Sequence, residues 1–321
     1  MTRRQLPITF LIGLFILCGA GCGSDDDQPD GRTIAEIMEQ DDRFEVSVNL
    51  MERAAVFSLL RARGGQFTHF GLTNEVVRTS PLIDIVNTPT EDLVNLYYYH
   101  TLAEDLPTVG IGSGISYLRT ISGASPNNAP LSILVDNGFT GIRLNGGQAI
   151  LTEADIEANN GTLHVISDVL TLPDALDHLE NNPTFFSEFV AAVERVGLTN
   201  ELSDSGPLTI LAPTNAAFAA ARPILDTISD AGLARLLSSH VLPQQVRTED
   251  VRAEGAEMFA AVASRLDEQT VAFLEAEVAG QAPTYSLRDG RGQTLEIFFP
   301  NIQGINGVVH ALDAFLLPQN F

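Results

Sequence analysis

Residues 206–218 have the sequence GPLTILAPTNAAF, which predicts a strand, a tight turn and a helix in that order. The segment LTILA is rich in strand formers, and the strand is expected to end at Pro213, which has no backbone N–H to donate. Thr214 or Asn215 can then cap the first turn of a helix. Phe218 follows one turn later, where its ring can fold back onto a core.

A weaker copy of this pattern lies earlier in the chain. Residues 67–77, FTHFGLTNEVV, correspond to the first pattern, and NGTLHVIS at 160–167 corresponds to NGVVHALD at 306–313. An isolated histidine lies between the two blocks of each copy. The spacings are 141, 140 and 146 residues for the pairs Asn74 and Asn215, His100 and His240, and His164 and His310. The chain is therefore predicted to be a tandem duplication.

The repeat is long enough to form a whole domain, since independent cores usually form at roughly 100 to 150 residues. We predict two domains, at residues 33–173 and 174–321. In each, helical periodicity comes first, and short strands separated by Asn-Gly or Asp-Gly turns follow. This order favours an α+β fold, with N-terminal helices and a twisted sheet or sandwich, over an alternating α/β fold.

The first 22 residues are predicted to be an export signal, because two arginines precede a short apolar run that ends in small residues before Cys22. The end of this run resembles the lipobox of bacterial lipoproteins, although Gly19 stands where Leu is usual. We expect lipidation at Cys22, and the alternative is an ordinary signal peptide. Residues 23–32 lack large apolar side chains and are expected to form a flexible acidic tether.

Composition limits the partners and the chemistry. The formal net charge is −23 and the sequence has no Lys, so its field repels nucleic acid, which we exclude as a partner. Both cysteines lie within the first 22 residues, so no disulfide is expected in the exported protein. No cofactor motif is evident, and we expect no cofactor.

The blocks of the second domain resemble the fasciclin-like domain. That family is characterised by a T-x-F-A-P-T-N-x-A-F segment and by a later N-G-x-[IV]-H segment. The second domain matches both in order and spacing, with the family marks at Pro213, Thr214, Asn215, Phe218, Gly307 and His310. The resemblance covers this domain over its full length.

The first domain resembles the same family less closely. It keeps the marks at Thr73, Asn74, His100, Gly161 and His164. Gly71 and Leu72 replace the Ala-Pro pair, and Val77 replaces the Phe. We therefore expect this membrane-proximal copy to serve as support and the second copy to meet a partner.

The resemblance implies a noncatalytic module for adhesion or protein recruitment. Together with the predicted anchor, it implies an exported protein that is lipid-anchored in the bacterial envelope, at the outer membrane or the cell surface. Its partner would be a protein or a component of the envelope or extracellular matrix. The candidate partner-binding residues are Pro213, Thr214, Asn215 and His240.

Two other functions stay open. A carbohydrate- or small-molecule-binding protein would need an aromatic-lined pocket, for which the run Tyr97-Tyr98-Tyr99 is a candidate. A hydrolase would need His100 or His240 to meet a serine or a metal in space. No Gly-x-Ser-x-Gly motif is present, which favours hydrogen-bonded structural roles for the matched histidines.

The Asn-Gly pairs that precede the last strand of each domain have a simpler explanation. Asn160-Gly161 and Asn306-Gly307 are predicted to form turns in which the glycine has a positive φ.

Overall fold

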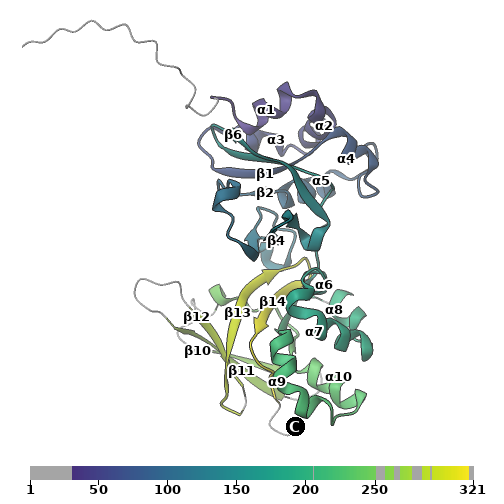
Figure 1. Cartoon of the computed structure of the whole chain (residues 1–321), viewed down its shortest axis with the longest axis vertical. Helices are drawn as coiled ribbons and strands as arrows, with labels where there is room; N and C mark the ends of the chain where they lie inside the picture. The colour runs from purple at the N-terminus through teal and green to yellow at the C-terminus, as the bar shows by residue number, and fades with distance from the viewer. Residues whose placement is uncertain are drawn as a thin grey trace, which may run out of the picture.

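The computed structural model describes residues 31–204, 206–250, 257–263, 268–276, 284–289 and 291–317 (Figure 1). The predicted export signal, the lipidation site at Cys22 and the tether as far as residue 30 lie outside the described residues. The described chain has two parts, and each combines helices with one seven-stranded sheet. The predicted α+β fold is confirmed.

The first domain places most of its helices before and between its first strands. Its helices are α1 (Ile34–Gln40), α2 (Glu45–Arg53), α3 (Phe57–Leu60), α4 (Asn74–Thr79) and α5 (Thr90–Tyr99), with 3-10 turns η1 (Asp42–Phe44), η2 (Thr108–Gly110), η3 (Pro126–Asn128) and η4 (Asn145–Gly147). Its strands are β1 (Phe67–Leu72), β2 (Thr101–Leu102), β3 (Gly114–Arg119), β4 (Ser132–Gly138), β5 (Gly141–Leu144), β6 (Ala149–Ala158) and β7 (Gly161–Ile166).

The second domain repeats this plan. Its helices are α6 (Ala175–Glu180), α7 (Pro183–Arg195), α8 (Thr199–Asp204), α9 (Asn215–Leu225) and α10 (Asp230–Ser238). Its strands are β8 (Leu208–Pro213), β9 (Val241–Leu242), β10 (Glu257–Ala263), β11 (Glu268–Ala276), β12 (Thr284–Arg288), β13 (Thr294–Gln303) and β14 (Gly307–Leu312).

The two sheets have the same strand order. It is β2-β1-β7-β6-β5-β4-β3 in the first domain and β9-β8-β14-β13-β12-β11-β10 in the second. In both, the strand of the first sequence block pairs in parallel with the last strand, β1 with β7 and β8 with β14. The duplication seen in the sequence is therefore a duplication of topology. The sequence patterns did not predict the strands β2, β3, β9, β10 and β11.

Both domains begin with a capping box, which satisfies the free N–H groups of the first helix. Thr33 Oγ1 accepts from Glu36 N at 3.2 Å, and Glu36 Oε2 accepts from Thr33 N at 2.7 Å. Asp174 Oδ1 accepts from Asp177 N at 2.7 Å, and Asp177 Oδ2 accepts from Asp174 N at 2.8 Å. Asp174 thus starts the first helix of the second domain in the same way as Thr33 starts the first helix of the first domain.

Each domain has its own core. The amphipathic helix α1 buries Ile34 and Met38 in the first, and α7 buries Phe186 and Phe189 in the second. Burial of such side chains supplies most of the stability of a small domain. Among the described residues, no helix combines the length and the apolar composition needed to cross a membrane.

The two domains touch where β3 of the first meets α6 and β13 of the second. The ring of Tyr117 packs edge-on against His178 at 5.8 Å and against Phe299 at 5.5 Å, measured between ring centroids. Asn182 Nδ2 donates to the Tyr117 hydroxyl at 3.0 Å. A side chain of the first domain therefore packs on the core of the second.

Candidate interaction site

The corner between β8 and α9 carries three of the residues predicted to bind a partner. Thr214 is the N-cap of α9, with Oγ1 accepting from Ala217 N at 3.3 Å, which confirms the predicted cap. Its own N–H donates to Leu312 O at 3.0 Å and ties the corner to β14. Pro213 is the buried last residue of β8.

The side chain of Asn215 joins α9 to the first turn of α7. Its Oδ1 accepts from Glu188 N at 2.9 Å. Its Nδ2 lies 3.1 Å from three acceptors, Pro183 O, Thr184 O and Ser187 Oγ. Because the amide is occupied on both sides, Asn215 holds the corner together and is half-buried while doing so.

His240 lies apart from that corner and inside the domain. Its side chain is fully buried, its Nδ1 lies 2.8 Å from Leu236 O, and its Nε2 accepts from Leu316 N at 3.0 Å. Because Nε2 accepts, the ring proton lies on Nδ1. A partner could touch this ring only if the domain opened, so the structure does not join His240 and Asn215 into one surface.

An apolar groove lies beside the corner. It has a volume of about 350 Å³ and is lined by Thr184, Phe185, Thr214, Asn215, Ala216, Phe298 and Asp313. Phe298 is 56% exposed, and its ring lies 5.5 Å from that of Phe185 and 4.5 Å from that of Phe299. Sequence reasoning missed Phe185 and Phe298, which are far from the corner along the chain.

The same corner exists in the first domain. Thr73 caps α4, with Oγ1 accepting from Val76 N at 3.4 Å. Asn74 Oδ1 accepts from Val46 N at 2.8 Å, and its Nδ2 donates to Asp42 O at 2.7 Å. Thr73 and Asn74 therefore have the same structural roles as Thr214 and Asn215.

The two corners differ in what surrounds them. Matching Asn74 with Asn215 places Arg43 where the second domain has Phe185, and the strand registers place Glu153 where it has Phe299. Arg43 forms an ion pair with Glu153, whereas Phe185 and Phe299 meet edge to face at 5.3 Å. Arg43 also holds the pKa of Asp41 and of Glu153 below the usual range by hydrogen bonding. One copy is therefore charged at this position and the other is aromatic.

These two corners should differ in their contribution to stability. Phe299→Ala is expected to lower the free energy of unfolding by about 2 kcal/mol, because the half-buried ring contacts three other aromatic rings. Glu153→Ala is expected to cost less than about 1 kcal/mol, because water screens an exposed ion pair. Urea unfolding of the two variants measures both values, and equal losses would contradict the comparison.

The signature histidines stabilise the same turns in both domains. His100 Nδ1 lies 2.7 Å from Leu96 O, and its Nε2 accepts from Leu170 N at 3.0 Å, which repeats the contacts of His240. The ring links the end of α5 to the segment that follows β7. Both rings therefore clamp the C-terminal segment of their domain onto a helix end.

His164 and His310 form a second matched pair on the last strands. Their Nδ1 atoms accept from Asp155 N at 3.1 Å and from Asn301 N at 3.3 Å. Both donors have φ near +58° and lie at irregularities in the strand pairing. The Nε2 atoms lie 3.1 Å from Leu106 O and 2.8 Å from Val246 O. Each ring thus supports a bulge in the preceding strand.

The hydrogen bonds of the four signature histidines argue against the hydrolase hypothesis. Every ring nitrogen of the four signature histidines lies within hydrogen-bond distance of a backbone group, which occupies the atom that a general base would need. In the described part of the chain, no group of three or more His, Cys, Asp or Glu could hold a metal ion.

The run Tyr97-Tyr98-Tyr99, which was the candidate for a carbohydrate-binding pocket, has its first and last side chains buried. The Tyr99 hydroxyl donates to Ser132 O at 3.0 Å.

The two signature glycines lie where the parallel strands approach most closely. Gly161 has φ +132°, as predicted, and a Cβ there would lie 1.8 Å from Phe67 O. Gly307 is not among the residues with positive φ, so the predicted turn geometry was wrong at that position. The second glycine is needed for space, because its Cβ would lie 2.2 Å from Leu208 O.

The family model described as the fasciclin domain matches residues 42–173 and again residues 184–318. The chain belongs to the fasciclin-domain family. A Synechocystis protein named sll1483 is 31% identical over 140 residues, which cover 41% of this chain and 67% of that protein. The transforming growth factor-beta-induced protein ig-h3 of Sus scrofa is 25% identical over 80% of this chain and 35% of its own length.

Further fasciclin-domain relatives extend well beyond this chain. A fasciclin-like arabinogalactan protein of Cercospora beticola is 27% identical over 57% of this chain, and the match spans 46% of the fungal protein. The matched regions span about a third of the Sus scrofa protein and about half of the fungal one. Among solved structures, a domain pair from the insect cell adhesion molecule Fasciclin I covers 89% of this chain and 96% of its own, with TM-score 0.49 and 15% identity.

Proposed function

We propose that this fasciclin-domain protein is a noncatalytic adhesion or interaction protein of the bacterial envelope. Its partner would be another protein or a component of the surrounding matrix. Membership of the family supports this proposal, as does the structural use of the signature histidines, which leaves them without a catalytic task. The strong negative charge suits a protein that stays soluble while exposed to solvent.

The groove beside the second corner is the proposed contact surface. The observation that carries this choice is the exposed ring of Phe298, which lies against Phe185, a position that in the first domain is taken by Arg43 of an ion pair. Exposed aromatic side chains at a groove are typical anchors of protein contacts. The hydrogen bonds that Thr214 and Asn215 make at the corner hold this surface in shape.

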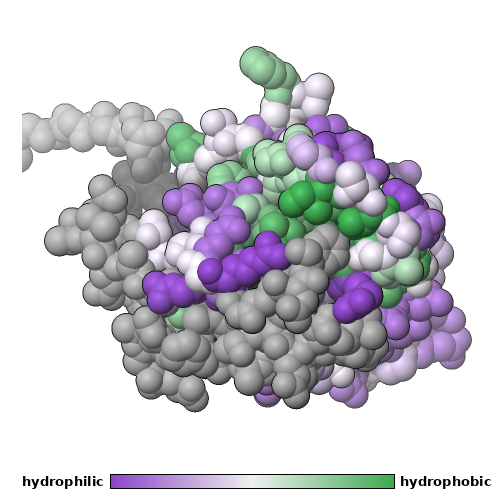
Figure 2. Space-filling model, turned by 90° about the horizontal axis from the view of Figure 1, so that it is seen from below, coloured by the Kyte–Doolittle hydropathy of each residue, from purple (hydrophilic) through white to green (hydrophobic). Residues whose placement is uncertain are grey.

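Apolar side chains are also present elsewhere on this domain. Figure 2 shows the end of the second domain at which α9 and α10 lie, and apolar groups gather there among hydrophilic ones. Ile224 of α9 is 38% exposed. A partner that meets the second domain therefore finds apolar surface beyond the groove itself.

The contact surface is tested by placing a charge at matched positions of the two domains. Strand pairing places Thr152 of β6 in the position that Phe298 has in β13. Phe298→Asp is expected to weaken binding of the mature protein to immobilised envelope extract by at least about tenfold, because the charge would have to be desolvated in the contact. Thr152→Asp should bind like the unaltered protein. Equal binding by all three proteins would overturn the proposed surface, and melting curves check that both variants are folded.

The lipid anchor is proposed from the sequence and has its own test. We expect the exported protein to incorporate labelled palmitate, and Cys22→Ser to lose the label and to appear in the soluble fraction, since removal of the acyl chains removes the apolar surface that holds it. Membrane retention of the variant without label would contradict a lipid anchor at this cysteine.

A further inference from the structure

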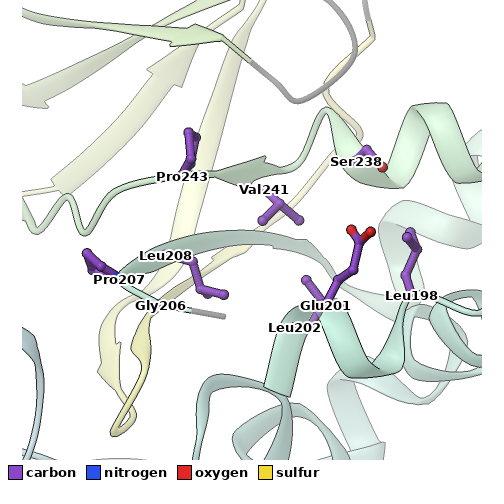
Figure 3. A pocket seen from close by; sticks show the side chains of 9 residues that line it. All are labelled: Leu198, Glu201, Leu202, Gly206, Pro207, Leu208, Ser238, Val241 and Pro243. Carbon is purple, nitrogen blue, oxygen red and sulfur yellow. The ribbon is translucent and has the colours of Figure 1, made fainter. Parts of the chain in front are cut away.

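A second hollow in the second domain lies between α8, the start of β8 and β9, away from the groove. It has a volume of about 160 Å³. Figure 3 shows its apolar side chains around one space, with Glu201 and Ser238 at its side. The apolar lining comes from Leu198, Leu202, Pro207, Leu208, Val241 and Pro243. An apolar space of about this volume is large enough for a benzene ring.

The first domain allows a direct comparison, because the same contacts recur there. Asn306 Nδ2 donates to Leu202 O at 2.8 Å, and Asn160 Nδ2 donates to Leu60 O at 2.8 Å. Leu198 N donates to Val193 O at 3.0 Å, as Val56 N does to Met51 O. The walls formed by Leu198 and Leu202 therefore correspond to Val56 and Leu60.

The first domain carries two aromatic rings at positions where the second has small or aliphatic side chains. The register of the parallel strands pairs Phe67 with Gly161 and Leu208 with Gly307, so Phe67 takes the position of Leu208. Tyr98 comes two residues before His100, and Ser238 comes two residues before the matching His240, so Tyr98 takes the position of Ser238. Both rings are partly buried against the first core.

The position of the Phe67 ring supports this comparison. A Cβ on Gly65 would lie 2.0 Å from the ring atom Cε2 of Phe67, so the ring covers that glycine. Gly206 precedes Leu208 as Gly65 precedes Phe67, and it lines the hollow. The second domain therefore has the corresponding walls, with Leu208 and Ser238 at the positions where the first domain has aromatic side chains.

We propose that this cavity binds a small phenolic molecule, whose ring replaces the one that Tyr98 supplies in the first domain. The apolar walls accept the ring, because a bound ring makes dispersion contacts with them and removes apolar surface from water. The Glu201 carboxylate accepts at several sites, so it can receive the phenolic O–H in addition to the interaction it makes within the chain. This ligand is independent of a partner at the groove.

p-Cresol, which is the tyrosine side chain cut at Cβ, is the probe that tests this proposal. We expect saturable binding of one p-cresol per chain by calorimetry, with an upward shift in the melting temperature of the second domain. Cyclohexanol should bind at least about tenfold more weakly, because it lacks the flat ring that fits between the walls. Absence of p-cresol binding would overturn the proposal.

Filling and opening the site in the two domains provide matched controls. Ser238→Tyr should abolish p-cresol binding and raise the melting temperature of the ligand-free protein, and Val241→Phe fills the hollow from β9 should the first variant not fold. Tyr98→Ser should open the same place in the first domain and raise the stoichiometry from one to two. Unchanged affinity in a folded filling variant would show that p-cresol binds elsewhere and would overturn the assignment.

Discussion

Acidification from pH 6.5 towards pH 4 is expected to destabilise the second domain by about 4 kcal/mol for each pH unit. Burial lowers the pKa of His178, His240 and His310 to about 4 each, from an ordinary value of 6.5. All three side chains are fully buried and donate or accept hydrogen bonds in the neutral form. Protonation therefore places a positive charge in the core and, at His240 and His310, breaks the hydrogen bond that a ring nitrogen accepts.

The direction of the effect follows from the order of the two pKa values. In each case the folded pKa lies below the unfolded one, so between pH 6.5 and pH 4 the unfolded chain binds more protons. The part of the free energy of unfolding that depends on neutral histidines is fully present above pH 6.5 and is lost as the pH falls. By pH 5 the loss is about 6 kcal/mol, which is comparable with the whole stability of a typical domain.

Urea unfolding at a series of pH values measures this loss. The chain has no Trp, so far-ultraviolet circular dichroism is the suitable signal. His240→Gln keeps a donor and an acceptor but cannot take up a proton, and it should reduce the pH slope by about 1.4 kcal/mol per unit. Burial raises the pKa of Asp177 and Glu180, and these two groups act in the opposite sense. A free energy of unfolding that stays flat between pH 6.5 and 4.5 would contradict the prediction.

Gly161→Ala is expected to destabilise the first domain by about 3 kcal/mol or more, because two costs act together. The backbone has φ +132°, which L side chains rarely adopt, and the added Cβ would lie 1.8 Å from Phe67 O. Phe67 is paired with Gly161 in the parallel strands β1 and β7, so the obstacle is backbone within a sheet. The strands would have to separate to admit a methyl group.

Gly64→Ala is the matched control for this substitution. A Cβ on Gly64 meets nothing within 4 Å, and its φ lies outside the range that excludes side chains. That change is expected to leave stability unaltered or to raise it by up to about 1 kcal/mol, since Ala restricts the unfolded chain. Chemical unfolding of both variants measures the difference. Similar stabilities would mean that the sheet tolerates a side chain at Gly161.

Several parts of the fold could be predicted because their causes are local. The break at Pro213 and the cap at Thr214 depend on residues within one turn, and both are present. The duplication was visible because the two copies keep the same marks at nearly constant spacing. Strand β3 was not predicted, because its sequence GISYLR is interrupted by polar residues and its Tyr117 packs on the other domain.

The sequence pointed to the part of the fold where the candidate site lies, but not to all of the residues that line it. The sequence pointed to the corner at Asn215, and the structure forms a groove there, but its exposed ring comes from Phe298 of β13. His240 was selected with the corner because the family carries a histidine there, yet burial removes it from any surface. Pattern and spacing do not report whether a polar side chain faces solvent or a backbone partner.

The sequence by itself determined that the chain has two copies of one α+β domain, because hydrophobic periodicity, caps and turns act over a few residues. Tertiary structure alone decided how the copies differ. Arg43 with Glu153 and Phe185 with Phe299 meet across more than a hundred residues, and Ser238 lines a hollow at the position where the first domain carries Tyr98. Such differences arise from contacts between distant segments, whose partners are chosen by packing and not by the order of residues along the chain.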